Sequence, residues 1–301
     1  MFVQNQELPL SHLSATLQRL RAASTFIFDV DGTLVERQQF LNPDLSRALV
    51  GCGKQLGIAT SRAQDELDEI FAFSTIPRSE LFQGPVILED GAVIIRDGAS
   101  QTIADPDHIR AIDSLRSYLT AHITSVGENN MWGQLAHIEA PLVHIPSRYD
   151  YQASMSVWQL PSGDGDNSHL FARIMAWCQD AVSDLKLQSM IKLVEIGDGT
   201  LRASVPGRSK GVALGELHQL NVLDLGSTVF FGDGKNDVAA AQVVKAAGGW
   251  VVAVDHKCQP LVDEANFVTS LPTDFNGLGT AGPKAIEGLL ALAATAESNL
   301  R

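Results

Sequence analysis

The stretch Phe26-Ile27-Phe28-Asp29-Val30-Asp31-Gly32-Thr33-Leu34 decides the fold of this chain. Its first three residues are apolar, as in a buried strand, and its polar half contains Asp-Gly, a turn signal. A buried strand followed by a solvated turn would account for this stretch alone. A carboxylate at the end of a core strand, with a second one two residues later, also suits a functional site, because open α/β sheets bind ligands at the carboxyl ends of their strands.

The composition restricts the class of protein. The chain has 301 residues, of which 45% are hydrophobic and 19% charged, which suits one or two globular domains with a large core. The net charge of -13 disfavours nucleic acid and anionic membrane as partners, since both are polyanions. No apolar run reaches the roughly 18 residues of a membrane span. We expect a reduced, cytoplasmic protein, because the N-terminus does not resemble a signal peptide and the three cysteines (Cys52, Cys178 and Cys258) form no CxxC pair.

Strand and helix patterns alternate along most of the chain. This alternation predicts an α/β fold with a doubly wound parallel sheet. The patterns indicate strands at 26–28, 55–60, 84–88, 227–231 and 250–254, a short edge strand at 266–269, and extended chain at 92–95. They indicate helices at 8–23, 42–50, 63–73, 211–220, 238–247 and 283–295.

The middle of the chain has a different texture. It runs in the order helix, strand, strand, helix, strand, strand, which suggests a compact α+β module. The expected elements are helices at 105–122 and 169–185, strands at 142–145, 153–160, 190–196 and 201–205, and a loop at 161–167. We therefore predict a core domain formed by residues 1–100 and 207–301, with an inserted cap domain at residues 101–206, hereafter the cap.

Two expected strands end in acidic turns, one at Asp29 and Asp31 and the other at residues 233–237. Both turns would lie at one edge of a parallel sheet, where their carboxylates would repel one another unless a cation joined them. Oxygen ligands of this kind suit magnesium. Thr60 and Ser61 offer hydroxyl and backbone N–H groups at a helix start, and Lys210 offers a positive charge. Together these groups indicate phosphoryl transfer, with a carboxylate that attacks phosphorus.

At these residues the chain resembles a phosphatase of the haloacid dehalogenase superfamily, with a Rossmann-like core. The resemblance covers residues 24–100 and 207 to about 290, and the four motifs stand in the family's order. They are Asp29-Val30-Asp31-Gly32-Thr33, Thr60-Ser61-Arg62, Ser209-Lys210-Gly211 and Gly232-Asp233-Gly234-Lys235-Asn236-Asp237. The cap resembles the C2-type caps of Cof-type sugar-phosphate phosphatases and phosphomannomutases.

The resemblance implies roles for individual residues. Asp29 would be the nucleophile that forms an aspartyl-phosphate, and Asp31 the general acid and then the base. Thr60 and Lys210 would hold the phosphate in catalysis. The implied phosphate-binding residues are Asp29, Gly32, Thr60, Ser61, Lys210 and Asn236. The implied magnesium site consists of Asp29, the Asp31 backbone carbonyl and Asp233, with Asp237 as a ligand or behind the ligands. Ser61 stands where this branch usually has Gly, and Asp90 where it usually has Asn.

Three functions remain open at this point. The first is a magnesium-dependent phosphatase acting on a small phosphorylated metabolite, foremost a sugar phosphate. The second is a phosphomutase, which would be expected to carry more arginines than the five of the cap: Arg110, Arg116, Arg148, Arg173 and Arg202. The third is a non-catalytic metabolite-binding protein, which would need no nucleophile. Candidates for gripping a leaving group are Trp132, His137, His144, Arg148, Trp158 and Arg202. No oligomeric state is predicted.

Overall fold

A computed structural model describes most of the core and about two thirds of the cap. The described residues are 10–36, 40–72, 74, 76–96, 98–124, 143–144, 151–159, 168–197, 200–269 and 282–298. The predicted loop at 161–167 and the side chains of Trp132, His137, His144, Arg148 and Trp158 lie outside this description. No helix among the described residues has both the length and the apolar character needed to cross a membrane.

An eight-stranded sheet forms the centre of the core, in the order β12-β11-β10-β1-β2-β3-β4-β5. The strands from β12 to β3 pair in parallel, so the turns that follow β1 and β10 lie side by side at the carboxyl edge. The strand bounds are β1 Thr25–Phe28, β2 Gln55–Ala59, β3 Val86–Leu88, β4 Val93–Arg96, β5 Ala99–Thr102, β10 Thr228–Gly232, β11 Trp250–Ala253 and β12 Phe267–Val268. The predicted α/β class with a doubly wound, mainly parallel sheet is confirmed.

Apolar side chains on successive strand residues point to opposite faces of this sheet, and each face has its own helices. Phe26 and Phe28 pack in one cluster with residues of α1, α2, α3 and α10, whereas Ile27 packs in another with residues of α7, α8 and α9. All three residues are buried, which explains the continuous apolar run before Asp29. The helix bounds are α1 Leu10–Ala22, α2 Pro43–Gly51, α3 Gln64–Phe71, α7 Lys210–Gln219, α8 Val238–Ala246, α9 Gln259–Glu264 and α10 Pro283–Ser298.

One edge of the sheet departs from the parallel prediction. β4 pairs antiparallel with β3, and β5 pairs antiparallel with β4. The short turn η1, Glu89–Gly91, reverses the chain between β3 and β4, and a reversal this short can join only antiparallel neighbours. The main sheet therefore includes Gln101 and Thr102, which the predicted boundary assigned to the cap. The patterns also missed the short helices α4, Arg78–Leu81, and α9.

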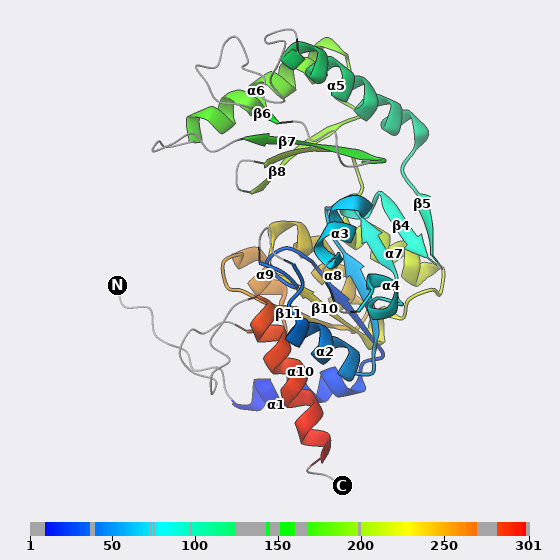
Figure 1. The fold of residues 1–301 in the computed structure, drawn as a ribbon, viewed down its shortest axis with the longest axis vertical. Coiled ribbons are helices and arrows are strands. Elements are labelled where there is room, and N and C mark those ends of the chain that lie inside the picture. Colours follow the sequence, from blue (N-terminus) through cyan, green and yellow to red (C-terminus); the bar gives the residue numbers. More distant parts are fainter. Residues whose placement is uncertain are drawn as a thin grey trace.

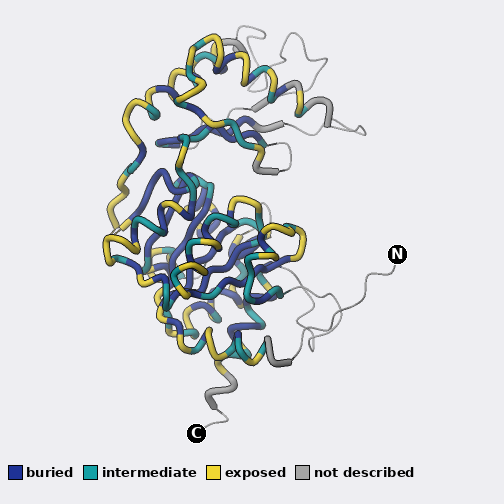
Figure 2. The backbone as a smooth tube through the Cα atoms, turned by 180° about the vertical axis from the view of Figure 1, so that it is seen from behind, coloured by how far each residue is buried: buried dark blue, intermediate teal, exposed yellow. Residues whose placement is uncertain are grey.

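The cap contains a second sheet, of four strands in the antiparallel order β6-β7-β9-β8. Figure 1 shows α5 and α6 on the side of this sheet away from the core. Buried residues of the two helices and of β7 and β9 form a cluster separate from the clusters of the core, and Figure 2 shows the two buried zones. The bounds are α5 Pro106–Thr124, β6 Val143–His144, β7 Ser154–Gln159, α6 Ser168–Asp184, β8 Lys192–Gly197 and β9 Thr200–Ser204. This element order is the one expected for the cap.

Candidate active site

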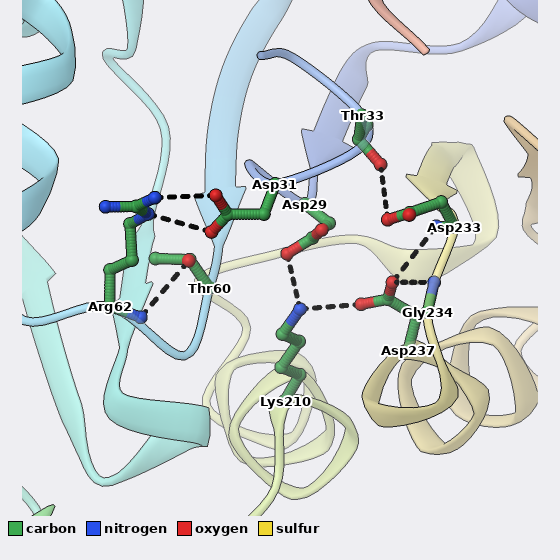
Figure 3. Close-up of polar contacts among 9 residues, drawn as sticks. All are labelled: Asp29, Asp31, Thr33, Thr60, Arg62, Lys210, Asp233, Gly234 and Asp237. Atoms are coloured by element: carbon green, nitrogen blue, oxygen red, sulfur yellow. Dashed lines mark hydrogen bonds and ion pairs between the residues drawn. The ribbon is translucent and has the colours of Figure 1, made fainter. Parts of the chain in front are cut away.

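A buried lysine lies between two of the predicted site carboxylates (Figure 3). Lys210 Nζ donates to Asp29 Oδ1 and to Asp237 Oδ1, at 2.6 Å in both cases. Asp29 directly follows β1, Asp237 ends the short turn η3, Lys235–Asp237, after β10, and Lys210 begins α7. Lys210 and Asp237 are inaccessible to solvent and Asp29 is nearly so. Three segments distant in sequence thus meet in one ion-paired cluster, which is the convergence expected from the strand ends.

Asp237 also holds the turn that carries Asp233. Its Oδ2 accepts hydrogen bonds from the backbone N–H groups of Asp233 (3.1 Å) and Gly234 (3.0 Å). With Oδ1 on Lys210, both oxygens of Asp237 have protein partners. This arrangement favours Asp237 as a residue that supports the lysine and the turn from behind the ligands.

Gly32 brings the first turn close to the fourth motif. Its φ is +77°, in the left-handed region that favours glycine, and a Cβ at this position would lie 2.0 Å from Asp233 Oδ2. Thr33, one residue later, donates from Oγ1 to Asp233 Oδ1 at 3.3 Å. The glycine of the first motif is therefore required for the close approach of the Asp29 turn and the Asp233 carboxylate.

The electrostatics of the cluster reflect its crowding. Burial raises the pKa of Asp29 well above its ordinary value, and Asp237 raises it further, while Lys210 opposes both effects. Burial, followed by the charge of Asp237, raises the pKa of Asp233 to about 6. Burial also acts to lower the pKa of Lys210, but Asp237 and Asp29 outweigh it and raise that pKa. The carboxylates thus carry more negative charge than one lysine offsets.

A divalent cation would balance the excess negative charge of these carboxylates. One carboxylate oxygen from each of Asp29, Asp233 and Asp237 lies within 4.8 Å of the others. Three carboxylates and one ammonium leave a formal charge of two negative units. Hard oxygen donors with this net charge suit magnesium, which takes a small number of carboxylates and completes its shell with water and substrate oxygens. The residues present therefore fit the predicted metal.

Asp31 lies apart from this cluster. Arg62 holds it with two hydrogen bonds, from Nε to Oδ2 at 2.8 Å and from Nη2 to Oδ1 at 2.6 Å (Figure 3). The Asp31 side chain is 34% exposed, compared with 7% for Asp29. The two carboxylates of the first motif therefore occupy different environments, one buried against lysine and one at the surface against arginine.

The loop after β2 places Thr60 beside these groups. Thr60 is buried, and its Oγ1 accepts a hydrogen bond from the backbone N–H of Arg62 at 3.2 Å, which leaves the hydroxyl proton free to donate. Ser61 is half-buried in the same loop. Asn236 is exposed on the turn between Asp233 and Asp237. All the predicted site residues thus lie on turns at the carboxyl edge of the sheet or at the start of α7, although their individual roles stay predictions.

Two contacts of the site were not predicted. The sequence analysis quoted Arg62 within the second motif but gave it no role, and the positive charge next to Thr60 was the available signal. Thr33 was likewise quoted without a role. Arg202, a candidate for gripping the leaving group, is instead buried and donates to the backbone carbonyl of Ser61 in the core. No pattern in the sequence pairs Arg202 with the second motif.

The α/β fold and the residues of this site are those expected of a haloacid dehalogenase-like phosphatase. Residues 165–281 match the family model of the haloacid dehalogenase-like hydrolases. The matched segment contains the third and fourth motifs. This match agrees with the resemblance that the motifs of the chain predicted. No curated protein matches the chain significantly.

Solved structures with the same fold cover nearly the whole chain. A trehalose-6-phosphate phosphatase related protein has a TM-score of 0.59 at 13% identity, covering 92% of this chain and 100% of that one. The C-terminal domain of the C. albicans trehalose-6-phosphate phosphatase has a TM-score of 0.58 at 15% identity, covering 94% and 96%. The Aspergillus fumigatus trehalose-6-phosphate phosphatase has a TM-score of 0.51 at 15% identity, covering 96% and 98%. The predicted enzyme class, a haloacid dehalogenase-type phosphatase, agrees with the family match and with the names of these structures.

Proposed function

We propose that the protein is a magnesium-dependent phosphatase that hydrolyses a small phosphorylated metabolite, with sugar phosphates as the preferred class. The observation that carries this proposal is the buried Lys210 between Asp29 and Asp237, with Asp233 beside them at the carboxyl edge of the sheet. Such a cluster supplies a nucleophile and a positive charge together, and a protein that only bound metabolites would not need the nucleophile.

In the first half of the reaction, Asp29 attacks phosphorus. A bond forms between an Asp29 carboxylate oxygen and phosphorus while the bond from phosphorus to the leaving oxygen breaks. Asp31 gives a proton to the leaving oxygen, so the metabolite departs as an alcohol. Lys210 fixes the other Asp29 oxygen and, with Thr60, offsets negative charge on the transferring group.

In the second half, water releases the phosphate. Asp31, now deprotonated, takes a proton from a water molecule that attacks the phosphorus of the aspartyl-phosphate. The bond between phosphorus and Asp29 breaks, which frees inorganic phosphate and the Asp29 carboxylate. Asp31 must leave Arg62 at least in part to reach the leaving oxygen, and its exposure at the surface permits that movement.

Asp29, Asp233 and the Asp31 backbone carbonyl would hold magnesium, with Asp237 behind them. When bound, the ion neutralises charge on the phosphoryl oxygens and orients them toward the nucleophile. The cap would close over the substrate and exclude bulk water before chemistry. Support for a sugar phosphate comes from the fold shared with trehalose-6-phosphate phosphatases.

The described cap arginines favour a phosphatase over a phosphomutase. Arg110 pairs with Asp107 on the exposed face of α5, and Arg116 donates to the backbone carbonyls of Tyr151 (3.2 Å) and Ser154 (2.9 Å). Arg202 is buried against the core. Because these three arginines already have partners in the protein, they are poorly placed to bind a second phosphate.

The cytoplasmic location stays a prediction. The three cysteines form no disulfide, which is consistent with it.

The test is a screen of phosphorylated metabolites with detection of released phosphate. The unaltered protein is assayed with magnesium and after removal of metal by a chelator, and Asp29→Asn serves as the matched inactive control. We expect release from one or a few sugar phosphates, dependent on magnesium and absent in the variant. Equal release by the chelated protein would contradict the metal role, and release by Asp29→Asn would contradict the nucleophile.

A further inference from the structure

Arg202 connects the cap to the loop of the second motif. It lies on β9 with only 4% of its surface exposed, and its Nη1 donates to the backbone carbonyl of Ser61 at 2.7 Å. The same nitrogen donates to Ser154 Oγ at 3.2 Å, and the guanidinium carbon lies 4.9 Å from the centre of the Tyr151 ring. Arg202 is therefore held by cap residues while it reaches across to the core.

The contact fixes one peptide plane in the phosphate loop. A trans peptide is planar, so the Ser61 carbonyl and the Arg62 N–H point in opposite directions. Arg202 holds the carbonyl, and the N–H donates to Thr60 Oγ1 at 3.2 Å. The bond from the cap thus sets the orientation of the N–H that donates to the Thr60 oxygen, whose own proton remains available to donate. Hydrogen bonds arranged in such a chain also polarise one another.

The neighbouring carbonyls of this loop are held from within the core. Thr60 O accepts from the N–H of Asp90 and Arg62 O from the N–H of Glu89, both at 3.1 Å. Among the described residues, the middle carbonyl of this loop, that of Ser61, has its hydrogen bond from the cap. The loop therefore has two anchors that stay with the core and one that depends on where the cap lies.

Two buried carboxylates lie near Arg202. Glu89 is buried, and its carboxylate accepts from Gln152 N (2.8 Å), Ala153 N (2.9 Å) and Ser154 Oγ (2.7 Å), all of the cap. Glu66, also buried, accepts from Ala63 N at 2.9 Å. Burial acts to lower the pKa of Arg202, but the neighbouring groups Tyr151, Glu66, Asp90 and Glu89 outweigh it and raise that pKa. Burial of Arg202 is thus compensated by charge, and its Nη1 remains directed at the core carbonyl.

We propose that Arg202 is a positioning residue. Through its bond to the Ser61 carbonyl, the conformation of the phosphate-binding loop depends on the position of the cap. This inference rests on the proposed function, since it concerns the same phosphate site. When the Arg202 bond is made, Thr60 presents its proton to the phosphate; when the cap moves and the bond is lost, the peptide is free to turn and phosphate is bound less tightly. In this role Arg202 acts on the phosphate through the loop.

The test compares Arg202→Lys with Arg116→Lys. Arg202→Lys keeps the charge near Glu89 and Glu66 but lacks the fixed guanidinium fork. Arg116 is the matched control, because it too donates to the cap segment at 151–154, through the backbone carbonyls of Tyr151 and Ser154. Within the described part of the chain it forms no hydrogen bond to the core. The probe is inorganic phosphate as a competitive inhibitor, since it has no leaving group for the cap to grip. We expect inhibition by phosphate to weaken about tenfold in Arg202→Lys, as for loss of a charged hydrogen bond, and not in Arg116→Lys.

Both variants are also compared by thermal unfolding. If Arg202→Lys lowers the unfolding temperature as Arg116→Lys does but leaves inhibition by phosphate unchanged, Arg202 is only a structural residue and the inference is wrong. If Arg202→Lys does not fold, Arg202→Gln replaces it, because its shorter side chain leaves the Ser61 carbonyl, with Arg116→Gln as control and the same two outcomes.

Failure of the proposed function would look different. The unaltered protein would then release phosphate from no metabolite, whatever the variants do. Amide hydrogen exchange of the segment 56–63 tests the inference without turnover: we expect faster exchange in Arg202→Lys and no change in Arg116→Lys. Equal exchange in both variants would overturn the positioning role even in a protein with no phosphatase activity.

Discussion

Asp29 and Asp31 are two residues apart in one turn, yet they differ in burial and in ion-pair partners. Asp29 is buried and shares Lys210 with Asp237, whereas Asp31 is a third exposed and its partner among the described side chains is Arg62. A carboxylate fixed from several sides suits a nucleophile, which must keep its place relative to phosphorus. A carboxylate with one partner at the surface suits a proton carrier, which must move between the leaving oxygen and water. The difference in burial therefore corresponds to the difference in proposed roles.

The largest effect is expected for the buried member of the pair. Asp29→Asn removes the nucleophile, so turnover should fall on the order of 10⁴-fold or more, as for other enzymes that lose a nucleophile. No covalent phosphate should appear in mass spectra of rapidly quenched samples. Full turnover by this variant, with deamidation excluded, would show that Asp29 is not the nucleophile.

Asp31→Asn should cost less and should depend on the leaving group. It removes the proton carrier, worth about 10²–10⁴-fold in rate, but keeps the nucleophile. The loss should be smallest with aryl phosphates, whose leaving groups need little protonation, and a phosphoenzyme should accumulate because its hydrolysis remains slow. Rates on aryl and alkyl phosphates, together with quenched mass spectrometry, check this. Phosphate attached to Asp31 would reverse the assignment of the two aspartates.

Lys210→Met should lower the free energy of unfolding. Removal of the lysine leaves Asp29 and Asp237 buried without their ion-pair partner, which costs about 3–5 kcal/mol in the free energy of unfolding. Lys245→Met is the control, because Lys245 pairs with Glu264 at 3.3 Å in a partly exposed position and such a pair contributes at most about 1 kcal/mol. Unfolding by denaturant measures both. Equal losses of unfolding free energy in the two variants would mean that the buried ion pairs of Lys210 stabilise the protein no more than an exposed pair.

The smallest expected effect concerns the pH dependence of the metal-free protein. The pKa of Asp233 is raised from 3.8 to about 6 in the folded protein. The folded state therefore favours protonated Asp233, and this stabilisation is complete below the unfolded pKa and is lost as the pH rises through about 6. With Asp233→Asn as reference, the loss should stay below about 3 kcal/mol, because the side chain is partly exposed.

Magnesium should reverse that loss at neutral pH, since it offsets the charge of Asp233. Thermal unfolding of the chelated protein and of Asp233→Asn from about pH 4 to pH 7, and then with magnesium, gives the comparison. The same pH dependence in both proteins would show that Asp233 does not titrate in this range.

The sequence alone determined which strands end in functional residues. The apolar run before Asp29 and the one before Asp233 each predicted a buried strand, and parallel pairing of β1 with β10 brings their carboxyl ends together. Local patterns located most helices of the core, such as the helix predicted at 42–50 and found as α2, because these patterns depend on residues a few positions apart.

Only the tertiary structure decided how the groups of the site are paired. The bond of Arg62 to Asp31 spans 31 residues, and that of Arg202 to Ser61 spans 141. The antiparallel edge formed by β4 and β5, too, depends on how a short turn folds back on the sheet. Local patterns report burial and turns but not which distant side chain fills a given place. That choice depends on packing and charge compensation in the folded chain, and it is there that Asp29 and Asp31 become different.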